Sequence, residues 1–156
     1  MAILFYSTNE VPYGCFSNFS PHPVELDGAL WPTSEHYFQA QKFAGTPHVE
    51  AVRRAASPMI AARMGRSRQR PLRDDWEQAK DDVMRRVVLA KFTQNAEIRA
   101  ILLATGDEEI IENTTRDYYW GCGTNGTGKN MLGRILVEVR EQLRGLSPVV
   151  RDAASN

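Results

Sequence analysis

The sequence predicts an α+β protein that is rich in helix and has its short strands near the ends of the chain. Extended apolar segments occur before residue 32 and again after residue 107, whereas the middle of the chain places apolar residues at helical spacing. No internal repeat or linker divides the 156 residues. We therefore expect one domain over residues 1–146, followed by a frayed tail over residues 147–156.

The first part of the chain combines short strands with a capped helix. Residues 2–7 predict a strand, and residues 23–31 predict a hairpin that turns at Asp27-Gly28, a pair that tolerates positive φ. Thr33 or Ser34 then caps a helix that extends to about residue 44 and stops near Gly45.

Further helices follow from their start signals and their spacing. Residues 46–57 and 57–68 each begin with a hydroxyl residue followed by Pro, the start of a short helix. A longer helix begins at Asp74-Asp75. Its expected buried positions are Trp76, Ala79, Val83, Val87 and Ala90.

The last third predicts a helix, a strand, a loop and a final helix. The first helix covers residues 96–104 and is closed by Gly106, and a strand is expected within residues 108–114. A glycine-rich loop over residues 121–128 leads into a helix over residues 129–145. Its apolar stripe consists of Leu132, Ile135, Leu136, Val139 and Leu143.

Composition excludes several classes of protein. The chain is 42% hydrophobic and 24% charged, which excludes a natively disordered protein. No apolar run approaches the roughly 20 residues of a membrane span, and no export signal opens the chain, so we expect a cytoplasmic protein without membrane contact. Cys15 and Cys122 stand apart, without the spacing of a disulfide framework or a zinc site, and we expect no metal and no cofactor.

Charge is balanced in total but uneven along the chain. The 19 basic and 19 acidic residues cancel, yet residues 53–73 contain seven arginines and no Asp, Glu or Lys. Such a cluster suits a ligand that carries phosphate. Equally, it suits a solvated basic face that pairs with Asp74, Asp75 and Glu77. The sequence leaves both interpretations open.

The helix after Thr33 places an acid, an amide and an amine on one stripe. At 100° per residue, Glu35, Gln39 and Lys42 fall together, away from Tyr37. A solvated helix face gives the same pattern. A functional site is the other interpretation, because the surrounding rings could stack on a flat heterocycle; they are Trp31, His36, Tyr37, Phe38 and Phe43.

A second group of residues surrounds the glycine-rich loop. Asp117 precedes three aromatic residues, and Gly123 to Lys129 matches G-x-x-x-x-G-K. However, Asn130 stands where a phosphate-binding P-loop needs Ser or Thr, and no buried strand precedes the loop. Zinc-hydrolase, α/β-hydrolase and Rossmann motifs are also absent. The loop is either a flexible turn that starts a helix or a binding site for phosphate or ribose.

Several motifs together resemble the NADAR family, the YbiA-like N-glycosidases, over about residues 4–144. The motifs are FYSTNE, CFSNFSP, WPTSEHYFQAQKF, SPMIAARMGRSR, PLRDDWEQAKDDVM, KFTQN and YYWGCGTNGTGKNMLGRILVEVRE. The resemblance implies a YbiA-like fold and hydrolysis of an N-glycosidic bond at a phosphorylated ribose. The implied substrates are either early riboflavin-pathway intermediates, the ribosylamino-pyrimidines, or ADP-ribose attached to guanine bases.

The resemblance also implies roles for individual residues. By motif, Glu35, Lys42 and Asp117 match the family's functional acid, amine and second acid, while Trp76 and Trp120 match its ligand-site aromatics. Together with the rings, arginines and loop described above, the expected substrate-binding residues are Trp76, Trp120, Tyr37, Arg63, Arg66, Gly121, Gly128, Lys129 and Asn130.

The expected partner is a small ribosyl phosphate or ADP-ribosyl compound. Neutral overall charge with local arginines allows transient contact with ADP-ribosylated DNA or RNA without requiring it. A binding module that recognises ADP-ribose or NAD without cleaving it is an alternative, and a module that docks its basic segment to an acidic protein is a third. The sequence leaves open the base, the biological role and the oligomeric state.

Overall fold

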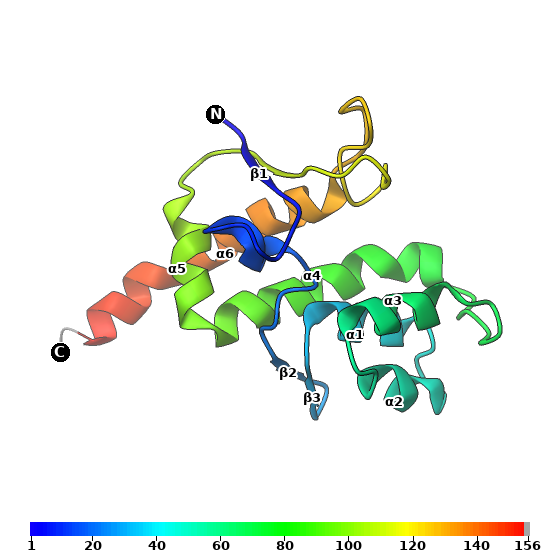
Figure 1. Cartoon of the computed structure of the whole chain (residues 1–156). Helices are drawn as coiled ribbons and strands as arrows, with labels where there is room; N and C mark the ends of the chain where they lie inside the picture. Colours follow the sequence, from blue (N-terminus) through cyan, green and yellow to red (C-terminus); the bar gives the residue numbers. More distant parts are fainter. Residues whose placement is uncertain (155–156) are drawn as a thin grey trace. The chain divides into compact units, whose positions relative to one another are not determined.

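The computed structural model of the chain describes the backbone of residues 1–154 and the side chains of residues 1–146 (Figure 1). Within this range the chain forms helices α1–α6, one short 3-10 helix and strands β1–β4, which confirms the predicted α+β fold. The chain divides into two compact units, Asn18–Gln94 and Met1–Ser17 with Asn95–Asn156. The prediction of one domain over residues 1–146 stays a prediction.

The unit Asn18–Gln94 contains a hairpin and four helices. Its elements are β2 (Val24–Leu26), β3 (Ala29–Trp31), α1 (Ser34–Gln41), α2 (His48–Arg53), α3 (Pro58–Arg66) and α4 (Trp76–Gln94). Strands β2 and β3 pair antiparallel, with Val24 opposite Trp31. Asp27 and Gly28 have φ of 55° and 76°, so the predicted tight turn is confirmed.

Helix α1 lies at the centre of this unit and packs against α2, α3 and α4. The Thr33 side chain caps it by accepting the N–H of His36, as the sequence predicts. The helix ends at Gln41, three residues earlier than expected, and turns carry the chain to Gly45 at φ 84°. Ser57 caps α3 in the same manner, with Pro58 at the first helical position.

Helix α4 buries a different face from the one predicted. Trp76 and Val87 are buried as expected, but the other three predicted positions are only partly covered. The remaining buried positions are Met84, Val88, Lys91 and Phe92. Because both α1 and β2 pack against α4, its buried face is wider than a single stripe and is rotated around the helix.

The other unit pairs the start of the chain with a strand more than 100 residues later. Its elements are β1 (Ile3–Phe5), the 3-10 helix η1 (Tyr13–Phe16), α5 (Ala96–Ala104), β4 (Ile110–Glu112) and α6 (Met131–Ala154). Strands β1 and β4 pair in parallel, with Ile3 opposite Ile110. Strand β4 packs against α6, whose five predicted apolar positions are all buried.

Side chains and the loop close the edge of β4 that does not pair with β1. The Asn130 amide donates to the carbonyl of Ile110 at 2.8 Å and accepts the N–H of Glu112 at 3.0 Å. The carbonyl of Glu112 accepts the N–H of Cys122 at 3.0 Å. An open strand edge is a template for unwanted pairing, so these bonds protect the sheet.

The prediction of a frayed tail concerns residues 147–156, whose side chains lie outside the described part of the chain, as does the backbone of residues 155–156. In the described part, none of the helices has both the length and the apolar character that crossing a bilayer requires.

Candidate active site

Glu35, Gln39 and Lys42 lie along one face of α1, and Glu35 and Gln39 are buried. The Gln39 Nε2 donates to Glu35 Oε2 at 2.8 Å. Only 8% of Glu35 and 6% of Gln39 are exposed. Because both side chains are buried and bonded to each other, the interpretation of this stripe as a solvated face is wrong for the acid and the amide.

The segment before α1 fixes the backbone of Glu35. The N–H of Glu35 donates to the carbonyl of Asn18 at 3.1 Å, and the Ser34 hydroxyl donates to Asn18 Oδ1 at 2.9 Å. The first bond satisfies a backbone N–H at the start of the helix that has no partner within it, and the second ties the Ser34 side chain to the same residue. The first turn of α1, which carries Glu35, is thus held by the Thr33 cap and by Asn18.

Lys42 follows the last residue of α1 and is half-buried between two rings and α3. Its Nζ lies 5.9 Å from the centre of the Phe38 ring and 5.8 Å from that of Trp76, and it donates to the carbonyl of Gly65 at 3.4 Å. Burial lowers the pKa of Lys42 to about 8. Glu35 opposes this shift, and Arg68 and Arg66 add to it. A considerable fraction of this amine is therefore neutral near pH 8.

The aromatic residues of α1 separate into two groups. Phe38 packs edge-on against Trp76, with ring centres 5.2 Å apart, on the side of Lys42. Tyr37 faces the hairpin instead, where its hydroxyl donates to Asp27 Oδ2 at 2.7 Å and its ring meets Trp31 edge-on. Burial and the nearby Asp27 carboxylate raise the pKa of Tyr37 to about 12. The structure thus places Trp76, but not Tyr37, with the acid and the amine.

The arginine segment divides into paired and unpaired side chains. Arg53 and Arg54 pair with Glu50, and Arg73 pairs with Asp75 at 2.6 Å. Arg63 and Arg66 are exposed on α3 and pair with no carboxylate among the described residues. Among the described residues of this segment, Arg73 is the arginine that pairs with the acids that follow it.

Arg68 bends back onto the end of α3, beside Lys42. Its guanidinium donates to the carbonyls of Gly65 and Arg66. The carbonyl of Gly65 thus accepts from both Arg68 and Lys42. With Arg66, these cations make the surroundings of Lys42 attractive to an anionic group.

Asp117 and Trp120 belong to the other unit, in the segment between β4 and α6. Asp117 Oδ1 accepts the N–H of Tyr119 at 2.9 Å and the N–H of Trp120 at 2.8 Å, so this oxygen holds a turn. Trp120 packs edge-on against Tyr119, and the Lys129 amine lies 5.4 Å from the centre of the Tyr119 ring.

Backbone N–H groups at the end of the glycine-rich loop donate to carbonyls of the segment just before it. Residues 128–132 donate, in order, to the carbonyls of residues 122, 118, 121, 119 and 120. A Cβ at Gly121 would overlap the Thr114 side chain, and one at Gly128 would overlap the Gly121 carbonyl, so both glycines allow close packing. These five N–H groups are occupied within the loop. Substrate contact by Gly121, Gly128, Lys129 and Asn130 stays a prediction.

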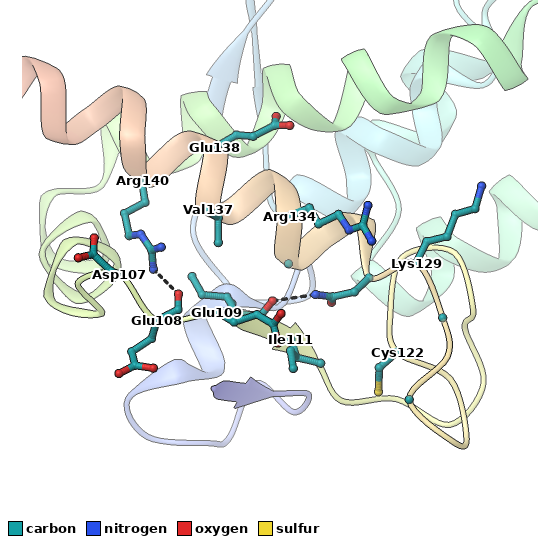
Figure 2. A pocket seen from close by; sticks show the side chains of 15 residues that line it. Asp107, Glu108, Glu109, Ile111, Cys122, Lys129, Arg134, Val137, Glu138 and Arg140 are labelled. Carbon is teal, nitrogen blue, oxygen red and sulfur yellow. Dashed lines mark hydrogen bonds between the residues drawn. The ribbon is translucent and has the colours of Figure 1, made fainter. Parts of the chain in front are cut away.

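A cavity of about 580 Å³ lies along the closed edge of β4 and was not anticipated from the sequence. Figure 2 shows acidic side chains of Asp107 and Glu108 at one end and Cys122 and Lys129 at the other. The acidic end is matched within the chain, because Asp107 pairs with Arg144 and Glu108 with the N-terminal amine. Among the described residues, no cluster of His, Cys, Asp and Glu could hold a metal ion.

Sequence reasoning placed Gln39 on the right stripe but assigned it no role, and it did not single out Gly65. It named Arg68 only within the arginine cluster and as part of a possible docking segment. A Cβ at position 65 would overlap Gln39 Oε1, so α3 approaches α1 closely at this point. A glycine inside an amphipathic helix was the available signal, since such a residue usually marks a close contact.

The chain is similar to known proteins over most of its length. The family model described as the NADAR domain matches residues 4–144. A protein of Escherichia coli strain K12 named N-glycosidase YbiA is 57% identical over 141 residues, 90% of this chain and 88% of that protein. An NMR structure of E. coli YbiA matches with a TM-score of 0.85 and 56% identity, covering 92% of this chain and 85% of that one. A Vibrio vulnificus protein named riboflavin biosynthesis protein VVA0006 is 44% identical over 146 residues, 94% of this chain and 40% of that protein.

Proposed function

The chain belongs to the NADAR family, and from this we propose that it hydrolyses the N-glycosidic bond between a phosphorylated ribose and a heterocyclic base or amine. The N-glycosidase name of the E. coli relative supports this class of reaction, since identity is 57% over most of both chains. The chain is thus a hydrolase that acts on N-glycosyl compounds.

One observation in the structure carries the proposal. A buried carboxylate, Glu35, lies within electrostatic reach of Lys42, an amine whose pKa is lowered to about 8 by burial. A carboxyl group and a partly neutral amine are both able to act on an electrophilic sugar carbon near neutral pH.

The surroundings of Lys42 support a substrate that has a ring, a sugar and phosphate. Trp76 provides aromatic surface for a base, and exposed Arg63 and Arg66 provide guanidinium groups for phosphate oxygens. In this proposal the ribose lies between them, next to Glu35 and Lys42. Trp120 and Asp117 are proposed as further contacts on the basis of the family motif.

One route for the reaction uses carboxylates alone. As the bond between the anomeric carbon and nitrogen breaks, positive charge develops on the sugar, and Glu35 stabilises it. Water then attacks the anomeric carbon, while a carboxylate takes the water proton and the departing nitrogen gains a proton.

The other route uses Lys42 as a nucleophile. The neutral amine attacks the anomeric carbon of the opened ribose, and the departing nitrogen leaves with a proton. The resulting Schiff base is hydrolysed by water, which regenerates the amine and frees the sugar. Substitution Lys42→Ala separates the routes, because near-normal turnover would exclude the covalent one, and borohydride trapping of an adduct would support it.

Two substrate classes satisfy the same chemistry. The name of the V. vulnificus relative favours a ribosylamino-pyrimidine phosphate of riboflavin synthesis, although this chain spans 40% of that protein. ADP-ribose on a guanine base is the second class, and it brings two phosphates to the exposed arginines. If the ADP-ribose is attached to DNA or RNA, KM should rise steeply with salt.

Turnover of both substrates by the wild-type protein tests the proposal. An ADP-ribosylated guanosine oligonucleotide and a ribosylamino-pyrimidine phosphate are incubated in parallel, and the products are identified by mass. Release of free base, amine or unmodified oligonucleotide establishes the activity and chooses the substrate class. Tight binding of ADP-ribose or NAD with no product from either substrate would instead favour the binding module.

A further inference from the structure

The glycine-rich loop contains the one Asn-Gly pair of the chain, Asn125-Gly126. Both residues are exposed, and Gly126 has φ of 75° with open space where a Cβ would lie. Because glycine has no side chain, its backbone nitrogen is less shielded than that of any other residue. The N–H of Gly126 is held by a long hydrogen bond, 3.4 Å to the carbonyl of Gly123. Its nitrogen is therefore accessible for reaction with a neighbouring group.

The side chain of Asn125 folds over the peptide group that follows it. Its Oδ1 accepts the N–H of Thr127 at 3.3 Å and the Thr127 hydroxyl at 2.6 Å. Such a turn brings Cγ, the side-chain carbonyl carbon, toward the nitrogen of the next residue. Two donors on Oδ1 also draw electrons from Cγ and stabilise negative charge on the oxygen. Cγ of Asn125 is thus an activated electrophile beside the nitrogen of Gly126.

The other asparagines in the described part of the chain lack one of these features. Asn18 and Asn130 use both ends of their side-chain amides in hydrogen bonds. Asn9, Asn95 and Asn113 are followed by Glu, Ala and Thr, whose side chains shield the next nitrogen. Since Asn9 is exposed like Asn125, it provides a control within the same molecule.

We propose that Asn125 is a site of spontaneous deamidation in the folded protein and that Thr127 promotes the reaction. The N–H of Gly126 gives its proton to hydroxide, and the nitrogen forms a bond to Cγ of Asn125. The bond between Cγ and Nδ2 then breaks, and ammonia leaves with a proton taken from water. Water opens the resulting succinimide at either of its two carbonyls, which yields aspartate or isoaspartate at position 125.

The reaction changes a loop that borders the cavity along β4. Gly126 and Gly128 line this cavity, and Lys129 stands at its loop end (Figure 2). Deamidation adds a negative charge beside the cavity, and isoaspartate also lengthens the backbone by one methylene group. The consequence for activity rests on the proposed function, in which Gly128 and Lys129 are predicted substrate contacts. Added negative charge should then weaken the binding of a phosphorylated substrate.

Storage of the wild-type protein in water enriched in oxygen-18 tests the inference. Protein kept at 37 °C and pH 8 is sampled over days, and each sample is digested in ordinary water, so that later reactions carry no label. We expect the peptide with Asn125 to gain about 3 Da and to contain isoaspartate as well as aspartate. The peptide with Asn9 should react at least roughly tenfold more slowly. Equal rates at the two sites, or no isoaspartate at position 125, would overturn the inference.

The role of Thr127 is tested with Thr127→Val and the matched control Thr115→Val. Val keeps the branched shape of Thr and removes the hydroxyl donor. Thr115 is exposed in the segment before the loop, and its hydroxyl does not bond Asn125. We expect Thr127→Val to slow deamidation roughly three- to tenfold, and Thr115→Val to leave the rate unchanged. An equal or faster rate in Thr127→Val would show that Thr127 does not promote the reaction.

Kinetics of Asn125→Asp separate this inference from the proposed function. The variant carries the charge of the deamidated protein, and it should raise KM for the phosphorylated substrate roughly two- to fourfold at low salt, with little change in kcat. The control Asn9→Asp should leave both constants unchanged. A KM equal to that of wild type in Asn125→Asp would contradict the effect on binding. If wild-type protein cleaves neither substrate, the proposed function fails, and the mass analysis still decides whether Asn125 reacts.

Discussion

At the level of single residues, the burial of Lys42 opposes folding. Its pKa is about 8 in the folded chain, against the ordinary 10.5, so between these values the unfolded chain binds more protons and stability rises with pH. We expect Lys42→Met to stabilise the fold at pH 7 by about 1–2 kcal/mol, a figure that allows for partial exposure of the amine. The gain should shrink as pH rises from 8 toward 10.5.

Urea unfolding of both proteins at pH 7 and pH 10 measures this effect. A variant that is less stable than wild type at pH 7 would show that Lys42 contributes favourable contacts instead. Activity should fall in the same variant if the amine takes part in the reaction, which would be a trade between stability and function.

Asp117 has a structural role that must be separated from any chemical one. Its Oδ1 holds the N–H groups of Tyr119 and Trp120. Asp117→Asn keeps this acceptor and removes the charge, so the melting temperature should change little while turnover falls at least tenfold. Asp117→Ala removes the acceptor and should also lose about 1–3 kcal/mol of stability. Full activity of Asp117→Asn would restrict this residue to holding the loop.

Site residues were predictable from the sequence as far as helical spacing and family motif allow. The angular position of Glu35, Gln39 and Lys42 follows from 100° per residue, and the structure keeps them together. Their burial does not follow from spacing, because α3 and α4, which pack against α1, come later in the chain. The bond of Tyr37 to Asp27 does not follow from spacing either, and contact of Tyr37 with the substrate stays a prediction.

At the level of elements, His36 joins α1 to the connection between α2 and α3. The Thr33 hydroxyl, which caps the helix, lies 2.8 Å from His36 Nδ1, and Nε2 lies 3.0 Å from the carbonyl of Ala55. An uncharged ring satisfies both contacts if Thr33 donates to Nδ1 and Nε2 donates to Ala55. Burial lowers the pKa of His36, although its bond to Ala55 works in the opposite direction.

A pH dependence of stability follows from this histidine. Below about pH 6.5 the unfolded chain takes up a proton at His36 before the folded chain does, so the free energy of unfolding should fall as pH decreases. Urea unfolding at pH 7.5 and pH 5 should show a smaller fall for His36→Gln than for wild type. His48→Gln is the matched control and should behave as wild type; equal falls in all three proteins would contradict the role of His36.

Helix α6 contains two glycines that should respond oppositely to the same substitution. A Cβ at Gly133 would overlap the Ile110 carbonyl and the Asn130 side chain that closes β4, so Gly133→Ala should destabilise the fold by more than about 2 kcal/mol. A Cβ at Gly145 meets nothing within 4 Å, and Gly145→Ala should stabilise the helix by about 0.5–1 kcal/mol. Thermal unfolding compares them, and equal effects would contradict the packing of α6 on β4.

Elements were predictable where a local signal sets their ends. The Asp27-Gly28 turn, the Ser57-Pro58 helix start and the Gly106 stop all follow from backbone preferences of single residues. The pairing of β1 with β4 was not predictable in this manner, because nothing local links strands more than 100 residues apart. The buried face of α4 was missed for a related reason, since two elements cover that helix and widen its contact.

At the level of the whole molecule, the net charge is zero, but basic residues are concentrated in one segment, and this matters for binding. The chain has no net charge, yet Arg63 and Arg66 have no paired carboxylate among the described residues, whereas Glu50 and Asp107 pair with nearby arginines. Attraction of an anionic substrate should therefore act at short range, next to Lys42, and not through a field of the entire protein.

The most direct test of the central claim is the turnover number of Glu35→Gln on the substrate that the wild-type protein cleaves. Glu97→Gln provides the matched control, because Glu97 is an exposed acid on α5. We predict that Glu35→Gln binds the substrate, unfolds at a similar temperature and loses at least 100-fold in kcat, whereas Glu97→Gln behaves as wild type. A kcat equal to that of wild type in folded Glu35→Gln would contradict the assignment of a catalytic role to Glu35.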